Sequence, residues 1–188
     1  MSKKFEQMED DKLFNLLSED KETAEKAFSE LYARYSPRVF AYCRRFLGNK
    51  EEAQDVFQES FVRFFQSASE DRVMTNVPGF LLRITRNLCV NELRRNKNNV
   101  TFEEYMVSED NDISDKDELL NLIKRALDLL PPEYREAFVL REYEGMTYAE
   151  IAEMIDESLS NVKIRIYRAK QKIREILAPY LADISKFD

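Results

Sequence analysis

Cationic side chains gather near the C-terminal end of the chain, where they could neutralise phosphates and read base edges. Between Ser158 and Arg174 there are six Lys and Arg residues and no Asp or Glu, a local charge of +6. The whole chain has a formal net charge of −7, so this stretch differs sharply from the average. Lys and Arg donate to phosphate oxygens and to guanine. The stretch therefore favours DNA binding over a merely solvated helix surface.

Groups that carry out covalent chemistry are scarce in this sequence. There is no histidine, which removes the commonest general base and metal ligand. The three glycines are scattered, so no phosphate-cradling loop is expected. Cys43 and Cys89 each fall among apolar helical positions, which predicts two buried thiols rather than a disulfide or metal ligands. We therefore expect no catalytic residue, no metal, no cofactor and no enzymatic activity.

Length and composition indicate the fold class and the compartment. The 188 residues can form one large or two small domains, and three Gly with five Pro favour an all-helical protein. No run approaches the ~18 apolar residues that a membrane span needs, and the N-terminus lacks a secretory apolar segment. We expect a cytoplasmic protein that does not insert into a membrane.

The basic stretch is predicted to be the second helix of a helix-turn-helix. Thr147 and Glu150 have capping-box spacing and predict the start of a short helix. The turn residues 156–158 follow, and the basic helix begins near Ser158. Its apolar residues recur at steps of three or four and predict one buried face: Val162, Ile166, Ala169, Ile173 and Leu177. The second helix of such a motif enters the major groove by its N-terminal end.

The N-terminal half is predicted to be a helical bundle. Apolar spacing indicates one or two helices over residues 8–35, a restart at Ser36–Pro37 and a stop at Gly48. Asn49 has capping-box spacing with Glu52 and opens the next helix. The core side of that helix is expected to hold Ala53, Val56, Phe57, Ser60, Phe61 and Phe64. Its opposite side carries the polar residues Asp55, Gln58, Glu59 and Arg63.

A second basic helix is predicted over residues 78–97, after a loop over 67–76. Five cations against one acid leave it a surplus of +4, and Phe80 stands at its start. An aromatic ring beside cations is typical of sites for single-stranded nucleic acid, because a base can stack on the ring. Core packing of Phe80 is the alternative that the residues leave open.

An acidic stretch separates the two basic helices. Residues 101–118 hold eight acids and one lysine, a charge of −7. We interpret residues 98–118 as a flexible linker between two small helical domains, 1–97 and 119–188. The second domain is expected to hold four helices, with the basic helix last and a frayed tail after Pro179.

These segments together resemble an extracytoplasmic-function (ECF) sigma factor, a small bacterial transcription-initiation subunit. The resemblance covers about residues 24–97 and 119–177. Ala53–Phe65, AQDVFQESFVRFF, and Gly79–Arg95, GFLLRITRNLCVNELRR, are similar to sigma region 2. Leu130–Ile173 is similar to region 4 over its full length. Many regulators share a lone helix-turn-helix, but its coupling to the two region 2 segments is specific.

The resemblance implies that the chain directs core RNA polymerase to specific promoters and supports promoter melting. Region 4 of the family reads the −35 element in double-stranded DNA. That role would fall here to Ser160, Asn161, Lys163, Ile164, Arg165, Tyr167 and Arg168. These positions lie in the first turns of the basic helix, where side chains can reach base edges.

The resemblance also implies contacts with melted DNA and with proteins. Region 2 of the family captures the unpaired −10 strand beside the loop before the basic helix, which here implies Phe80, Arg83 and Asn87. The helix with Asp55, Gln58 and Glu59 would dock on the clamp helices of the polymerase's largest subunit. Contact with the polymerase flap and control by an anti-sigma factor are further implications.

Several positions depart from the family's usual pattern. The chain has no Trp, so Phe65 and Phe80 stand where many members carry Trp, and stacking should be weaker. Asn161 and Ile164 replace the more usual Thr and Ser, so base preference cannot be carried over from relatives. Asp156 replaces a turn glycine, but Asp tolerates a left-handed backbone.

Two DNA-binding domains on one chain predict a bivalent promoter reader. An extended linker of roughly twenty residues reaches about 65 Å, whereas a turn and a half of duplex is about 50 Å. The linker can therefore span two promoter elements.

Two other classes of protein stay open as alternatives. A stand-alone helix-turn-helix regulator would bind duplex tightly without polymerase. A helical adaptor would bind DNA without salt dependence or not at all.

Overall fold

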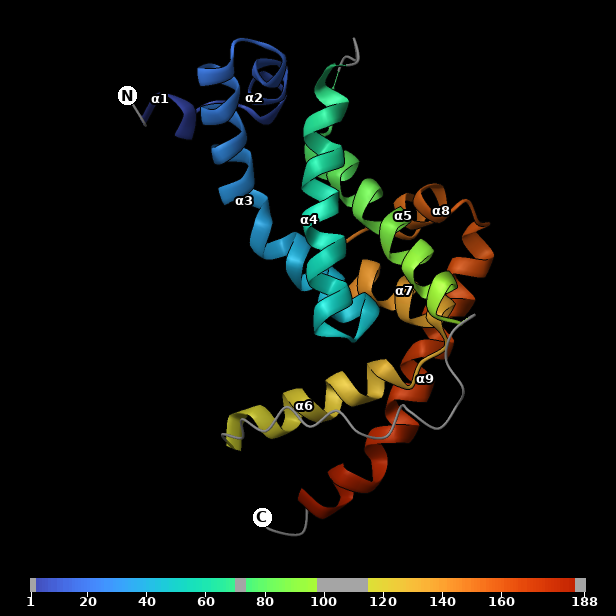
Figure 1. Ribbon diagram of the computed structural model, residues 1–188. Coiled ribbons are helices and arrows are strands. Elements are labelled where there is room, and N and C mark those ends of the chain that lie inside the picture. The colour runs from blue at the N-terminus through green and yellow to red at the C-terminus, as the bar shows by residue number, and fades with distance from the viewer. Residues whose placement is uncertain (1–2, 70–73, 98–114, 185–188) are drawn as a thin grey trace. The chain divides into compact units, whose positions relative to one another are not determined.

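Helices make up every regular element that the structure describes. The computed structural model describes residues 3–69, 74–97 and 115–184, in which no strand occurs (Figure 1). The chain divides into two compact units, Met1–Val100 and Thr101–Asp188. The expected all-α class with two helical domains is therefore confirmed. Most of the predicted linker lies outside the described residues.

The first unit is built on three long helices. The helices α3 (Lys21–Leu47), α4 (Lys50–Gln66) and α5 (Val77–Lys97) pack against one another, with α4 in contact with both others (Figure 1). The core between them includes the fully buried side chains Leu31, Tyr42, Phe46, Phe64, Leu81 and Cys89. Cys43 is buried as well, so the prediction of two buried thiols is confirmed. The elements of this unit are α1 (Lys3–Glu6), α2 (Asp10–Asn15), the 3₁₀ turns Leu16–Ser18 and Ser67–Ser69, α3 (Lys21–Leu47), α4 (Lys50–Gln66) and α5 (Val77–Lys97).

Local signals explain where α3 and α4 begin and end. Asp20 caps α3 by accepting from the backbone N–H groups of Glu22 and Thr23, at 3.1 and 3.2 Å. Gly48 ends α3 with φ 79°, a conformation that glycine adopts without strain. Asn49 then caps α4 by accepting from the N–H groups of Glu51 and Glu52. The predicted stop and the predicted cap are both confirmed.

The predicted helix restart at Ser36–Pro37 is wrong, because α3 continues through Pro37. A proline removes one backbone donor and leaves the carbonyl four residues earlier without its helical partner. Both Pro37 and Ala33, which carries that carbonyl, are exposed, so water can solvate the group. Leu31 and Val39 are buried on either side of the proline and hold the helix to the core.

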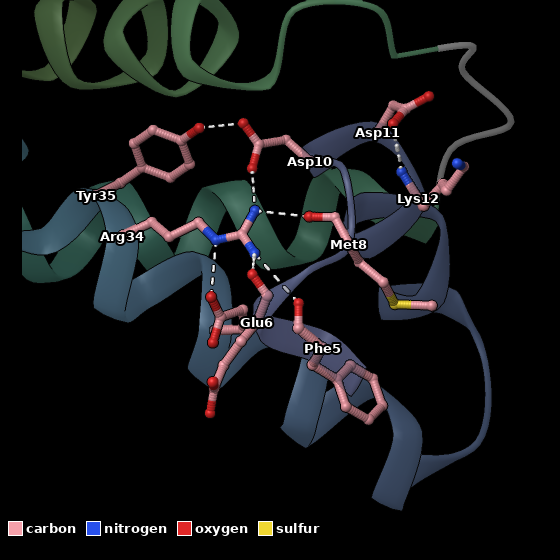
Figure 2. Close-up of polar contacts among 9 residues, drawn as sticks. Phe5, Glu6, Met8, Asp10, Asp11, Lys12, Arg34 and Tyr35 are labelled. Carbon is pink, nitrogen blue, oxygen red and sulfur yellow. Dashed lines mark hydrogen bonds and ion pairs between the residues drawn. The ribbon is translucent and has the colours of Figure 1, made fainter. Parts of the chain in front are cut away.

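One arginine fastens the N-terminal segment to α3. Arg34 donates to the carbonyl oxygens of Phe5, Glu6 and Met8 at 3.1, 3.0 and 2.9 Å (Figure 2). It also pairs with Asp10 at 2.7 Å and with Glu30 at 2.8 Å. Arg34 thus ties the end of α1 and the residues after it to α3. No local sequence pattern predicts this contact.

Within residues 115–184, the described part of the second unit, there are four helices, as predicted. These are α6 (Asp115–Asp128), α7 (Pro132–Glu142), α8 (Tyr148–Ile155) and α9 (Leu159–Ile184). The helix α9 packs against each of the other three (Figure 1). Part of the core is formed by Leu127, Leu130 and Ala169, with Ile123, Tyr134, Phe138 and Ile173 packed against them. Pro132 occupies the first turn of α7, where a missing N–H does no harm.

Two boundaries of this unit differ from expectation. The helix α6 begins at Asp115, so the last residues of the predicted linker are helical. The helix α9 does not end at Pro179 but runs on to Ile184, so the frayed tail after Pro179 is wrong for residues 180–184. Pro179 and Glu175, whose carbonyl loses its partner, are both exposed, which is the arrangement seen at Pro37.

Candidate nucleic-acid interface

A capping box sets the start of the helix-turn-helix. Thr147 Oγ1 accepts from the backbone N–H of Glu150 at 3.2 Å, and Glu150 Oε2 accepts from the N–H of Thr147 at 2.7 Å. The hydrogen bond that the Glu150 carboxylate accepts from the backbone of Thr147 is the main cause that lowers the pKa of Glu150 below its ordinary value. The helix α8 ends at Ile155, and the next residue, Asp156, has the left-handed backbone φ 55° and ψ 54°. The expected cap and the expected turn conformation are confirmed.

The helix α9 buries one face and presents the other. Val162, Ile166 and Ala169 are at most 2% exposed, whereas Tyr167 is 67% exposed and Ile164 47%. At 3.6 residues per turn, Ile164 lies opposite the buried stripe. Of the seven predicted contact positions, Arg165 is half-buried and the rest are exposed: Ser160, Asn161, Lys163, Ile164, Tyr167 and Arg168. The structure thus brings the predicted −35 residues onto one continuous surface.

Several of these side chains have protein partners. Asn161 Nδ2 donates to Glu157 Oε2 at 3.0 Å, and Arg165 pairs with the same carboxylate. The hydrogen bond from Asn161 and the charge of Arg165 lower the pKa of Glu157. Arg168 donates to the hydroxyl of Tyr134 on α7 at 3.0 Å. Glu157 is not among the predicted residues, although its spacing of four and eight residues from Asn161 and Arg165 is a usable signal in the sequence.

The second candidate surface lies at the start of α5. Asn76 Oδ1 accepts from the N–H of Gly79 at 2.9 Å and caps the helix. The half-buried ring of Phe80 lies 6.3 Å, centroid to centroid, from the rings of both Phe14 and Phe64. One side of the Phe80 ring therefore packs against these two rings. Its exposed part remains the surface on which a base is predicted to stack. Arg83 and Asn87 are exposed one and two turns further along.

An open cleft borders the loop before α5. One side is formed by Thr75 and Asn76 of the loop with Val77 and Pro78 at the start of α5, and the other by Glu9, Asp10 and Asp11 of the N-terminal segment. This is where the resemblance implied that a base of the melted strand is held. The sequence does not predict that these three acids lie here, because the contact between the segments is long-range.

The predicted docking face of α4 is exposed. Asp55, Gln58 and Glu59 all lie at the surface, and Glu59 accepts from Arg63 Nε at 2.7 Å. Val62, 49% exposed, follows on the same side of the helix. The face is thus polar at its N-terminal end and apolar further on.

Within the described residues, no helix is long and apolar enough to cross a membrane.

Two family models match this chain, one in each unit. Residues 31–99 match the family model for Sigma-70 region 2, and residues 120–173 match that for Sigma-70, region 4. The ECF RNA polymerase sigma factor SigE of Mycolicibacterium smegmatis is 33% identical over 173 residues, covering 88% of this chain and 67% of that protein. The RNA polymerase sigma-H factor of Pseudomonas aeruginosa is 30% identical, covering 84% of this chain and 90% of that protein.

Solved structures show the same fold. The sigma factor RpoE of Bartonella quintana, in complex with the anti-sigma factor NepR, has a TM-score of 0.64 at 20% identity, covering 81% of this chain and 98% of that chain. CnrH in complex with the cytosolic domain of CnrY has a TM-score of 0.66 at 22% identity, covering 91% of this chain and 99% of that chain. From both region matches and these relatives, the chain belongs to the ECF family of RNA polymerase sigma factors, the initiation factors that give the polymerase its promoter specificity.

Proposed function

We propose that the two candidate surfaces divide promoter recognition between them. The first turns of α9 read the −35 element in the major groove, through the exposed side chains on either side of Ile164. The observation that carries this assignment is the exposed surface formed by six of the seven predicted residues, on a stretch with no acid between Ser158 and Arg174. Polar side chains there can reach base edges, and Lys and Arg can pair with guanine or phosphate.

The start of α5 captures the unpaired −10 strand and so supports melting. Arg83 lies one turn beyond Phe80, so a cation is available to the strand's phosphates close to the stacking ring. Asn87 follows on the same side and adds a hydrogen-bonding amide. Holding a base outside the duplex favours the open promoter because the captured strand cannot pair again.

The exposed face of α4 docks on the clamp helices of core polymerase through Asp55, Gln58 and Glu59. The second domain meets the polymerase flap, and both domains bind together as a bivalent reader of one promoter. Since the RpoE and CnrH structures are complexes with NepR and with CnrY, we include an anti-sigma factor among the partners. The protein acts in the cytoplasm, where the polymerase works, and leaves RNA synthesis to the polymerase.

Transcription in vitro tests this function. The full chain is combined with sigma-free bacterial core polymerase on fragmented DNA from the source genome, and new RNA starts are mapped. We expect discrete starts that share two upstream elements and that disappear without the chain. Tight duplex binding by the chain alone, with no polymerase-dependent starts, would instead indicate a stand-alone regulator.

A further inference from the structure

Glu157, in the turn before α9, contacts two of the predicted −35 residues at once. One carboxylate oxygen accepts from Asn161 Nδ2 at 3.0 Å, and the other pairs with Arg165 Nη2. The three residues follow one another at steps of four, so Asn161 and Arg165 lie one helical turn apart on the same side of α9. A single carboxylate therefore bridges the first two turns of the recognition helix.

The turn presents this carboxylate from a fixed backbone. Asp156 takes the left-handed conformation, and the N–H of Glu157 then donates to the carbonyl of Ala152 at 3.0 Å. Ser158 Oγ accepts from the N–H of Asn161 at 3.1 Å and caps α9. The side chains of Glu157 and Arg165 are only 28% and 23% exposed, so their ion pair is less screened than a pair at the open surface.

We propose that Glu157 is a positioning residue that sets base preference at the −35 element. This inference rests on the proposed role of α9 in reading that element. Glu157 holds Asn161 and Arg165 in their reading positions before DNA arrives, so less side-chain freedom is lost on binding. It also offsets the charge of Arg165, which weakens that residue's attraction to any phosphate and leaves its sequence-dependent contacts.

The contacts define what each side chain can offer to a base. The amide nitrogen of Asn161 is directed at Glu157, which leaves its oxygen as an acceptor for the amino group of adenine or cytosine. Arg165 meets Glu157 through Nη2, so its other nitrogens can donate to guanine. Without Glu157 both side chains gain rotamers that fit other base pairs, and discrimination should fall.

Selection from a randomised promoter pool tests the inference. Full-length protein and core polymerase are incubated with a duplex pool built on one mapped promoter, in which only the −35 segment is randomised, and the transcribed templates are sequenced. For Glu157→Ala we expect preference at the one or two base pairs read by Asn161 and Arg165 to fall about tenfold. Preference at the other positions should not change. A second variant, Glu157→Gln, keeps an acceptor for Asn161 and should retain part of the preference.

Two controls separate positioning from charge and from folding. Asp156→Asn removes the same charge at the adjacent exposed residue and keeps a side chain that tolerates the left-handed backbone, so its profile should match the unchanged protein. Arg165→Ala and the double variant Glu157→Ala, Arg165→Ala should lose the same preference at the base pair that Arg165 reads, because Glu157 acts there through Arg165.

The outcomes distinguish the inference from the function on which it rests. An unchanged profile for Glu157→Ala, or an equal loss at every position, overturns the positioning role while leaving the −35 assignment intact. If the unsubstituted protein selects no −35 sequence, the proposed function of α9 fails and the inference fails with it.

Discussion

Arg34 of α3 holds Asp10 of α2 with 2.7 Å between Nη1 and Oδ1 (Figure 2). Burial disfavours the charge of Arg34, but hydrogen bonds with Glu30 and Asp10 outweigh it and raise the pKa of the guanidinium. Asp10 also accepts a hydrogen bond from the hydroxyl of Tyr35. Burial together with this hydrogen bond raises the pKa of the Tyr35 phenol. The segment held in this way precedes residue 31, where the match to region 2 begins. It supplies the acids that border the cleft beside α5.

Replacing this arginine should release the N-terminal segment. We expect Arg34→Gln to lower the free energy of unfolding by about 2 kcal/mol, because a part-buried charge-assisted network is lost. Denaturant titration measures the stability, and amide exchange at residues 5–10 measures the local release. Lys26→Gln, which breaks only an exposed pair with Glu22, should cost less than about 0.5 kcal/mol. Unchanged exchange at residues 5–10 in the Arg34 variant would contradict the role given to Arg34.

The signals that predicted this structure correctly were local. Thr147 with Glu150 and the cap by Asn49 each involve groups within one helical turn, so their residue types and spacing suffice. Glu30 lies one helical turn before Arg34, but the partners of Arg34 in the N-terminal segment lie 24 to 29 residues earlier in the chain, and no local pattern relates them. The cleft acids were missed for the same reason.

The two errors at prolines have a shared physical cause. The sequence predicts a helix boundary at Pro37 and at Pro179, because proline removes a hydrogen bond inside a helix. In both cases the helix continues, and the residue four positions before the proline, whose carbonyl loses its helical partner, is exposed. Which side of a helix meets solvent depends on tertiary packing, so the sequence around a proline does not decide the outcome.

Gly79 is predicted to be needed for the start of α5. A β carbon there would lie 2.6 Å from Asn76 Nδ2, so Gly79→Ala should push aside the side chain that caps the helix. We expect a loss of about 1 kcal/mol in stability, typical of a lost cap, and weaker binding of a fluorescent −10 single strand by the holoenzyme.

A second glycine supplies the matched control for that variant. Gly145 has φ 71° and no atom within 4 Å of an added β carbon, so Gly145→Ala costs backbone strain of about 1 kcal/mol without displacing a cap. It should leave single-strand binding unchanged. If both variants weakened binding of the single strand equally, lost stability alone would explain the weaker binding.

The capping box of α8 predicts a pH-dependent stability. At neutral pH, Thr147→Ala should cost about 1 kcal/mol. The pKa of Glu150 is lowered from 4.5 by hydrogen bonds from Thr147, so the carboxylate stabilises the fold above pH 4.5 and this contribution is lost as the pH falls through the lowered pKa. Glu150→Ala removes this carboxylate, so its cost should shrink in acid, as followed by denaturant titration between neutral pH and pH values below 4.5. Thr147→Ala keeps the backbone N–H that lowers this pKa most, so its cost should change less. A cost of Glu150→Ala that stays constant over this range would contradict a role of the Glu150 carboxylate in the cap.

The exposed face of α4 predicts a defect that is confined to polymerase binding. Asp55→Ala and Gln58→Ala should each weaken association with core polymerase several-fold, since they remove polar contacts at the proposed interface. Glu25→Ala on α3, also exposed, should not. Binding is measured by fluorescence with labelled full-length protein. The variants should keep their melting temperatures, so a defect that tracks lost stability would argue against a docking role.

Lys163 is predicted to meet the DNA backbone, and salt dependence gives the sharpest test of that placement. Its side chain is exposed in the first turns of α9, on the opposite edge of the exposed face from Arg165. A lysine that neutralises one phosphate releases about one counterion, so Lys163→Ala should weaken promoter binding and reduce the slope of log affinity against log salt by about one. Because a phosphate carries no sequence information, base preference should stay as it is, in contrast to the change expected for Glu157→Ala. Lys124→Ala on α6 removes an equal charge from another exposed helix position and should leave the slope unchanged. A Lys163 variant with an unaltered slope and full promoter use would show that this edge of α9 does not face the DNA.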